Sequence, residues 1–342
     1  MDEPLKVAIV GCGFVAKAHH LPCYRKIKGV NVVAACDKSK KSLQRFCQKF
    51  HVGKSYQEIE LLLSNESLDF VDICTPPQTH YQLCLTAINH GVNVLVEKPI
   101  ALNPEQTIDL NNLSIRKNVK VCVVHNYRFR NPVLKAMEMY KKGRLGKIKQ
   151  VVSTIHMLSA FPEWVWNEKQ SGGFLYDSAL HFVDLQTFFC GEHDKIVGAY
   201  IENDEKMGLT TGMQTIIKYK GGAVGIIDMK AFSSSGRGTF DIYGTAADVH
   251  LKFYPDYFNL SVGNLSPYSE LIDEFKRFSN FAKYLFLLGM KKYRVEYHYK
   301  LISDYVKAIK ENKEPPVPIS SVINTMKLMY DLSTHMREKS HH

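Results

Sequence analysis

The feature that most constrains this sequence is the alternation of short apolar runs with helical stretches in its first third. Runs rich in β-branched residues, suited to buried strands, are each followed by a stretch with helical periodicity. The strand-like runs are Lys6–Val10, Asn31–Cys36, Phe70–Cys74, Asn93–Val96 and Lys120–Val124. The helical stretches are Ala16–Ile27, Lys40–Phe50, Gln57–Leu63, Thr79–Asn89 and Glu105–Lys117. This order predicts a doubly wound parallel sheet of the nucleotide-binding kind.

A glycine motif follows the first of these strands directly. The sequence VAIVGCGFVA places Gly11, Gly13 and Ala16 at the three small positions of a dinucleotide-binding turn. Gly11 allows the tight turn, Gly13 lets a pyrophosphate approach the backbone, and Ala16 permits close packing of the helix on the strand. The free N–H groups of the helix N-terminus would bind the phosphates, and we include Phe14 and Val15 in the predicted binding loop.

Asp37 ends the second strand, where an acidic residue is expected to bind the hydroxyls of an adenosine ribose. NAD is therefore the expected cofactor. Lys38, Lys40 and Lys41 lie beside this aspartate and could bind a 2′-phosphate, so NADP remains an alternative. We count Lys38 with Asp37 among the predicted cofactor-binding residues.

After about residue 125 the pattern changes. A helix over Pro132–Lys142 precedes four strand-like segments, and Gly221–Gly222 predicts a hairpin between two of them. The segments are Ile148–His156, Gln214–Tyr219, Ala223–Phe232 and Thr239–Gly244. The predicted fold class is α/β, with an N-terminal Rossmann doubly wound parallel sheet and a C-terminal α+β domain built on a largely antiparallel open sheet. We expect the boundaries at 1–124, 125–314 and 315–342, the last holding a final helix.

Composition excludes several classes of protein. With 342 residues, 45% of them hydrophobic and 23% charged, the chain is neither a disulfide-held mini-protein nor disordered. Its eight cysteines form no CxxC pair, which predicts reduced thiols, no zinc ribbon and a cytoplasmic location. We expect no secretion signal and no transmembrane segment. The net charge of +10 fits an anionic ligand or simple solubility, and the dispersed basic residues predict no nucleic acid partner.

Two further segments carry chemistry. Glu97-Lys98-Pro99 follows a strand, at the carboxyl edge of the sheet where doubly wound folds bind ligands. Far downstream, Asp177 and His181 are four residues apart in a predicted helix and so share a face. His181 is predicted to exchange a hydroxyl proton and Asp177 to orient its ring. Lys98 would stabilise developing alkoxide character and face the nicotinamide ribose.

Other interpretations of these residues stay open. An Asp/His pair on a helix is often a surface hydrogen bond, and Asp177, His181 and Asp184 could instead bind a metal. No cysteine or HExxH context supports a metal, and we predict none. Trp164, in the loop before this helix, is a candidate for stacking on a sugar, or else packs between domains. The apolar stripe and basic residues of 271–294 predict a core, lid or subunit interface, with binding to a membrane surface as the alternative.

Together these segments resemble the Gfo/Idh/MocA oxidoreductase family over nearly the whole chain. The segments that carry the resemblance are VAIVGCGFVAKAHH (7–20), CTPPQTHY (74–81), VEKPIA (96–101), NYRFRNP (126–132), GRLGKI (143–148) and SGGFLYDSALHFVDL (171–185). The resemblance implies a Rossmann domain, a second domain for substrate binding and oligomerisation, and a last helix that returns to the first domain. It also implies a cis peptide between Lys98 and Pro99 and a catalytic set of Lys98, Asp177 and His181.

The resemblance assigns further residues to the site. It places Thr75, Pro76 and His80 near the cofactor, where we also expect Glu97, and it places Asn126 and Arg128 near the substrate. The sequence departs from the family pattern at two positions, because Phe174 and Ala179 stand where glycines are usual. A bulky ring at 174 would reshape the substrate pocket.

The function implied is an NAD(P)-dependent oxidoreductase, which transfers hydride between nicotinamide and a secondary alcohol or ketone. The expected substrate is a sugar, a cyclitol or a sugar nucleotide, and the expected assembly is a homodimer or homotetramer through the C-terminal sheet. Two alternatives share this fold. They are an NAD-dependent glycosidase and a non-catalytic NAD-sensing regulatory protein.

Overall fold

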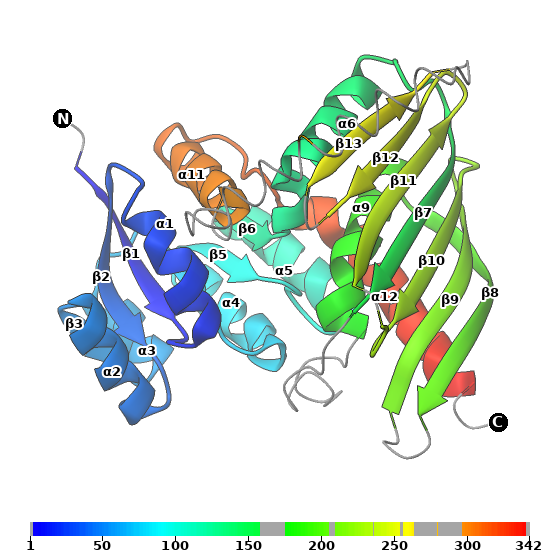
Figure 1. Ribbon diagram of the computed structural model, residues 1–342. Helices are drawn as coiled ribbons and strands as arrows, with labels where there is room; N and C mark the ends of the chain where they lie inside the picture. Colours follow the sequence, from blue (N-terminus) through cyan, green and yellow to red (C-terminus); the bar gives the residue numbers. More distant parts are fainter. Residues whose placement is uncertain are drawn as a thin grey trace. The chain divides into compact units, whose positions relative to one another are not determined.

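The computed structural model describes residues 3–157, 175–204, 209–234, 236–253, 256–262, 279 and 296–339 (Figure 1). The predictions for Trp164, for Phe174 and, apart from residue 279, for 271–294 therefore lie outside the described residues. The chain divides into two compact units. The first contains 1–126 and 294–326, and the second contains 127–293 and 327–342. This division differs from the boundaries predicted above, because the segment before the final helix joins the first unit and most of that helix joins the second.

The first unit is built on a six-stranded parallel sheet with the strand order β3-β2-β1-β4-β5-β6. The strands are β1 (Leu5–Val10), β2 (Val30–Cys36), β3 (Lys54–Tyr56), β4 (Phe70–Ile73), β5 (Asn93–Glu97) and β6 (Val121–Val124). The predicted Rossmann sheet is confirmed. The prediction missed β3, since three residues are too few to show an alternating pattern. The strand order reverses between β1 and β4, the position at which doubly wound sheets bind ligands.

Helical segments connect these strands or, after residue 294, rejoin the unit from later in the chain. They are η1 (Ala16–His20), α1 (Leu21–Tyr24), α2 (Lys40–Phe50), α3 (Ile59–Asn65), η2 (Pro77–Thr79), α4 (His80–Asn89), α5 (Pro104–Lys117), α11 (Glu296–Lys310) and η5 (Ile319–Val322). The start of α5 is specified locally, because Asn103 Oδ1 accepts the Gln106 N–H at 2.8 Å and Pro104 occupies the first turn. The helix predicted at Ala16–Ile27 is a π-helical turn, η1, followed by one short α-helix.

The second unit contains a seven-stranded sheet with the order β13-β12-β11-β7-β10-β9-β8. Its strands are β7 (Ile148–His156), β8 (His193–Asp204), β9 (Leu209–Tyr219), β10 (Val224–Lys230), β11 (Arg237–Gly244), β12 (Asp248–Lys252) and β13 (Tyr257–Ser261). Within this sheet, the β10–β7 pair is the one parallel pair among the described strands, so the largely antiparallel sheet is confirmed. The predicted hairpin joins β9 to β10, with Gly222 at φ +88°.

The helical segments of this unit are η3 (Asn126–Phe129), α6 (Asn131–Lys141), η4 (Leu175–Ala179), α9 (Leu180–Cys190) and α12 (Ile323–Lys339), of which η3 and α12 each begin in the first unit. Helices α6 and α9 lie against one face of the sheet (Figure 1). On β9, Met213 and Ile217 are fully buried beneath this face. Tyr200 and Ile216 point to the opposite face and are 64% and 46% exposed. No described helix has both the length and the apolar surface needed to cross a bilayer, and all eight cysteines are free thiols.

Candidate active site

A cavity of about 430 Å³ lies at the carboxyl edge of the parallel sheet, where β1 and β4 end. Its wall includes the predicted cofactor residues Gly11, Gly13, Asp37, Lys38, Thr75 and Pro76. The remaining predicted residues, Phe14, Val15, Ala16, His80, Glu97 and Lys98, do not line it. Phe14 is 72% exposed beside the loop, whereas Ala16 is fully buried against the sheet.

The two glycines have different roles in this cavity. Gly11 has a φ of +97°, and a Cβ there would lie 2.8 Å from the backbone carbonyl of Cys74, so no other residue fits. A Cβ on Gly13 would meet no atom within 4 Å. The space in front of Gly13 therefore belongs to the cavity, as a pyrophosphate lying close to the backbone requires. These observations fit a dinucleotide.

Asp37 holds the loop and faces the cavity. Its carboxylate accepts the backbone N–H groups of Cys12 and Ser39, each at 2.8 Å. Glu58 and Glu60 line the same cavity, in which Lys38 is the one cation of the described wall. Three carboxylates disfavour an additional 2′-phosphate, which supports NAD over NADP.

Lys98 follows β5 at the same edge of the sheet, and the peptide that joins it to Pro99 is cis, as the resemblance implied. Its backbone N–H donates to Glu97 Oε2 at 3.2 Å. On the other side, His80 Nδ1 lies 2.6 Å from the carbonyl oxygen of Pro99, and Nε2 of the same ring lies 2.7 Å from that of Thr75. His80 therefore connects the loop after β4 with the loop that carries Lys98.

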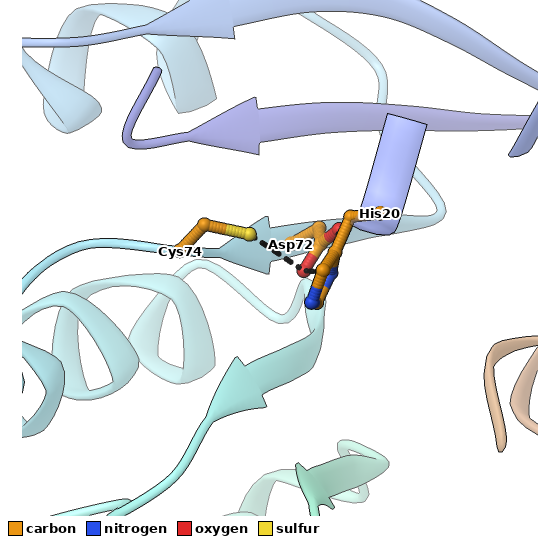
Figure 2. A group of neighbouring side chains, drawn as sticks. All are labelled: His20, Asp72 and Cys74. Atoms are coloured by element: carbon orange, nitrogen blue, oxygen red, sulfur yellow. Dashed lines mark hydrogen bonds and ion pairs between the residues drawn. The ribbon is translucent and has the colours of Figure 1, made fainter. Parts of the chain in front are cut away.

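A buried group of polar side chains, which sequence analysis missed, lies beneath this edge (Figure 2). His20 Nδ1 lies 2.8 Å from Asp72 Oδ2, and His20 Nε2 lies 2.9 Å from Glu97 Oε1. Figure 2 shows the ring of His20 reaching toward Asp72 on β4. The Cys74 thiol lies 3.6 Å from Asp72 Oδ1. The hydroxyl of Tyr24 donates to Asp72 Oδ2 at 2.9 Å. His20 and Asp72 are fully buried, and Glu97 is 8% exposed.

The pKa values in this group shift as expected for a histidine between two carboxylates. Burial alone would lower the pKa of His20, but the charge and hydrogen bonds of Asp72 outweigh it and raise that pKa well above its usual value. Burial alone would raise the pKa of Glu97, but the hydrogen bond and charge of His20 hold it well below its usual range. The group therefore carries ionised side chains in a dry interior.

His20, Asp72 and Cys74 are also of the types that bind metals, as are His20, Glu97 and His298. Each ring nitrogen of His20, however, already has a carboxylate oxygen at hydrogen-bond distance. Because a metal would need a free nitrogen lone pair, the geometry favours an ion pair over a metal ligand set.

Asn126 and His298 adjoin this group within the first unit. Asn126 Nδ2 lies 3.0 Å from His298 Nε2, and the His298 ring stacks on His19 with centroids 4.5 Å apart. Burial lowers the pKa of His298 to about 3, so this ring is neutral. Asn126 is 9% exposed, and its Oδ1 has no hydrogen-bond partner among the described residues. That oxygen is itself buried.

The second unit carries Asp177 and His181. Asp177 lies in the π-helical turn η4, and His181 lies in the first turn of α9, so the predicted single helix is divided at this point. The ring of His181 stacks on Tyr127, which in turn contacts Phe182 and Phe253 edge to face. Sequence reasoning did not include Tyr127, although it lies within the NYRFRNP segment.

Arg128 and Asp184 form a buried pair in the second unit. Arg128 Nε donates to Asp184 Oδ2 at 2.8 Å and Nη2 donates to Oδ1 at 2.6 Å, while the guanidinium lies over Phe188. Arg128 is 4% exposed and Asp184 is fully buried. This bidentate pair explains Asp184 without a metal and holds η3 against α9.

One signal in the sequence could have revealed the buried group. Asp72 interrupts an otherwise apolar strand, FVDI, and a carboxylate in a fully buried parallel strand requires a partner. The sequence alone could not show that His20 is this partner, or that Glu97 and His298 lie beside it, because the three residues come from distant segments.

Comparison with known proteins matches residues 5–125 to the oxidoreductase family with an NAD-binding Rossmann fold, and residues 133–250 to the GFO/IDH/MocA C-terminal domain. An oxidoreductase of Formosa agariphila is 34% identical over 207 residues, which are 57% of this chain and 64% of that protein. D-glucoside 3-dehydrogenase of Escherichia coli is 28% identical over 193 residues, 56% of this chain and 55% of that protein. The matched region thus spans roughly half to two thirds of these relatives.

Two solved structures share the whole fold. The WlbA dehydrogenase of Bordetella pertussis, in complex with NADH and UDP-GlcNAcA, has a TM-score of 0.84 at 17% identity. The alignment covers 99% of this chain and 97% of that one. Levoglucosan dehydrogenase in complex with NADH has a TM-score of 0.80 at 18% identity, with 98% of each chain covered. At these identities the likeness shows the fold alone.

Proposed function

Because the chain belongs to the Gfo/Idh/MocA oxidoreductase family, we propose that it is an NAD(P)-dependent dehydrogenase or reductase acting on a secondary alcohol or ketone of a carbohydrate-type substrate. The observation that carries this proposal is the cavity at the strand-order reversal, with a glycine that no other residue can replace and a carboxylate at the end of β2. Lys98 directly follows β5, the strand next to β4, at the edge of the sheet where a substrate would meet the cofactor.

The substrate class is drawn from the relatives. Those named above and D-apiose dehydrogenase of Paraburkholderia graminis, which is 26% identical over 69% of this chain and 63% of that protein, include enzymes named for sugars. WlbA was solved with a sugar nucleotide. A sugar, a cyclitol or a sugar nucleotide is therefore the substrate class that we propose for this chain.

The proposed chemistry uses residues of both units. A bound dinucleotide supplies the hydride acceptor or donor. During oxidation a ring nitrogen of His181 accepts the hydroxyl proton, and the carboxylate of Asp177 stabilises the resulting imidazolium. The ammonium group of Lys98 stabilises negative charge that develops on the substrate oxygen. Asn126 keeps its predicted place near the substrate, and Arg128, which already binds Asp184, would act by holding η3.

The test measures turnover of a panel of sugars, inositols and nucleotide sugars, with NAD and with NADP. Nicotinamide absorbance reports the reaction. His181→Ala should retain its affinity for NAD within about twofold and lose turnover by about 10²-fold or more. Near-normal turnover in that variant would contradict the assignment. Release of free sugar without net NADH would instead favour the glycosidase, and NAD binding without turnover on any substrate would favour a regulatory protein.

We also propose that the chain assembles as a homodimer or homotetramer through the sheet face of the second unit on which Tyr200 and Ile216 are exposed. Tyr200, Ile216 and Val224 present apolar surface there, on neighbouring strands β8, β9 and β10. Tyr200→Glu would place a charge in that interface, and light scattering should then report a smaller assembly than the native chain forms. A native chain that is monomeric at micromolar concentration would contradict this proposal.

A further inference from the structure

The stability of the fold does not explain why the buried group around His20 is charged. An ion triad in a dry interior seldom stabilises a fold better than apolar side chains of the same volume would. Here a histidine is fully buried between two carboxylates, on an interior edge that could have been apolar. The contacts of Glu97 give this arrangement a further consequence.

We infer that His20 is a positioning residue for Lys98: it holds the Glu97 carboxylate in the one orientation that binds the backbone N–H of Lys98. The inference rests on the proposed function only in taking Lys98 as a group of the active site. His20 itself is fully buried and is not expected to touch substrate or cofactor.

The charge of the His20 ring follows from its two contacts. A neutral imidazole has one N–H donor, and here both ring nitrogens face carboxylate oxygens at 2.8 Å and 2.9 Å. Two donors are needed, so the ring is an imidazolium. Asp72 is held in turn by the Tyr24 hydroxyl, which keeps one side of the ring anchored to β4.

Glu97 connects this cation to Lys98. Glu97 uses Oε1 for His20 and Oε2 for the N–H of Lys98, so the two oxygens have separate partners. Without the cation, a buried carboxylate would turn toward any available donor, because an unpaired buried charge is costly. On the other side of Lys98, His80 contacts the carbonyl oxygen of Pro99. The backbone is therefore held both at the Lys98 N–H and at the Pro99 carbonyl.

Other ionisable groups lie near Glu97 and Asp72. His298 Nε2 lies 3.8 Å from Glu97 Oε1, but burial keeps that ring neutral, so it does not replace His20 as the cation. Lys98 contributes its own charge from the residue next to Glu97, and the Cys74 thiol faces Asp72. His20 is thus the cation that both buried carboxylates contact directly.

Two variants interrupt this connection at different places. His20→Gln removes the cation, and Glu97→Gln leaves a side chain of equal size with one oxygen. If that oxygen accepts from His20, the NH₂ group of the introduced amide faces the Lys98 N–H, and two donors oppose each other. Tyr24→Phe is the matched control, because it removes a buried hydrogen bond from the far end of the same network and leaves Glu97 untouched.

The decisive readout is hydrogen exchange of the Lys98 backbone amide, measured on the full chain by mass spectrometry with site-resolving fragmentation. Both His20→Gln and Glu97→Gln should accelerate this exchange about tenfold or more, whereas Tyr24→Phe should not. In turnover assays both should lower kcat by about 10- to 100-fold, since small displacements of a catalytic group have effects of this size.

Each outcome decides the inference. Unchanged exchange at Lys98 in folded Glu97→Gln would overturn it, whether or not His20→Gln folds. A kcat no lower than that of Tyr24→Phe would also overturn it, as would one equivalent of zinc in the purified protein. If the native chain turns over no substrate, the proposed function fails, while the exchange experiment still tests the link between His20 and Lys98.

Discussion

The ring of Tyr127 lies parallel to the ring of His181, with centroids 4.1 Å apart and an angle of 9° between the planes. Tyr127 is itself held in place, because the fully buried Arg130 lies 4.7 Å from its centroid and forms an ion pair with Asp256. Phe253 contacts the same tyrosine. The candidate acid–base group is therefore oriented by an aromatic surface that has its own supports.

This stack predicts a difference between two substitutions. Tyr127→Phe retains the ring and should keep kcat within about twofold. Tyr127→Leu removes the flat surface, allows the imidazole of His181 to rotate, and should lower kcat about tenfold or more, with NAD affinity unchanged. Steady-state kinetics and NAD titration measure both effects, and equal kcat values for the two variants would show that the stack has no role in orientation.

The two glycines of the cofactor loop should respond differently to alanine. Gly11→Ala introduces a Cβ 2.8 Å from the Cys74 carbonyl at a φ of +97°, so the loop must distort and the free energy of unfolding should fall by about 1–3 kcal/mol. Gly13→Ala meets no protein atom and should keep the melting temperature. It should still weaken NAD binding about tenfold, because the methyl group occupies the space of the pyrophosphate. Calorimetry and NAD titration separate these effects, and a Gly13→Ala variant with native affinity would contradict the placement of the phosphates.

Asp37 should set the choice between NAD and NADP. Asp37→Ser removes one of the three carboxylates of the cavity wall and leaves Lys38 in place, so the ratio of NADP to NAD affinity should rise about tenfold or more. Affinity for NAD should also fall, since serine offers one oxygen where Asp37 uses Oδ2 for Cys12 and Oδ1 for Ser39. Glu105→Gln, on the exposed start of α5, is the control. Fluorescence titration with both dinucleotides measures the ratio, and an unchanged ratio would assign the choice to other groups.

The group around His20 predicts a pH dependence of stability. The folded pKa of Glu97 is lowered, so its contribution is present above the pKa of an unfolded glutamate, about 4.3, and is lost as the pH falls through the folded value. The folded pKa of His20 is raised, so its contribution is complete below the pKa of an unfolded histidine, about 6.5, and is lost as the pH rises through the folded value. Between about pH 4.3 and 6.5 both contributions are present.

His20→Gln leaves two buried carboxylates without this cation, so its deficit in unfolding free energy should grow from about pH 4 to about 6.5 and reach about 3–5 kcal/mol. Tyr24→Phe keeps the charges and should show a deficit that does not change over this range. Urea unfolding at several pH values measures both. A flat deficit for His20→Gln would mean that the ring is not charged in the folded protein.

Much of the first unit could be predicted from local patterns. The glycine turn, the buried strands and the carboxylate of Asp37 are each encoded within a few residues. The structure places the glycine turn and Asp37 along one cavity. The weaker predictions concerned segments whose pattern is short or mixed. The three-residue β3 shows no alternation, and the π-helical turns at Ala16–His20 and Leu175–Ala179 read as ordinary helix because their polar and apolar residues still recur every three or four positions.

By itself the sequence determined the fold class, the cofactor turn and the residue types that can carry charge, because strand periodicity, turn chemistry and residue type are properties of short segments. Only the tertiary structure decided what those charges meet. His20, Asp72 and Glu97 are contributed by three separate elements of the sheet unit, and Tyr127 reaches His181 across an equally long stretch of chain. Pairings of this kind arise from packing between distant segments, and no local pattern records them.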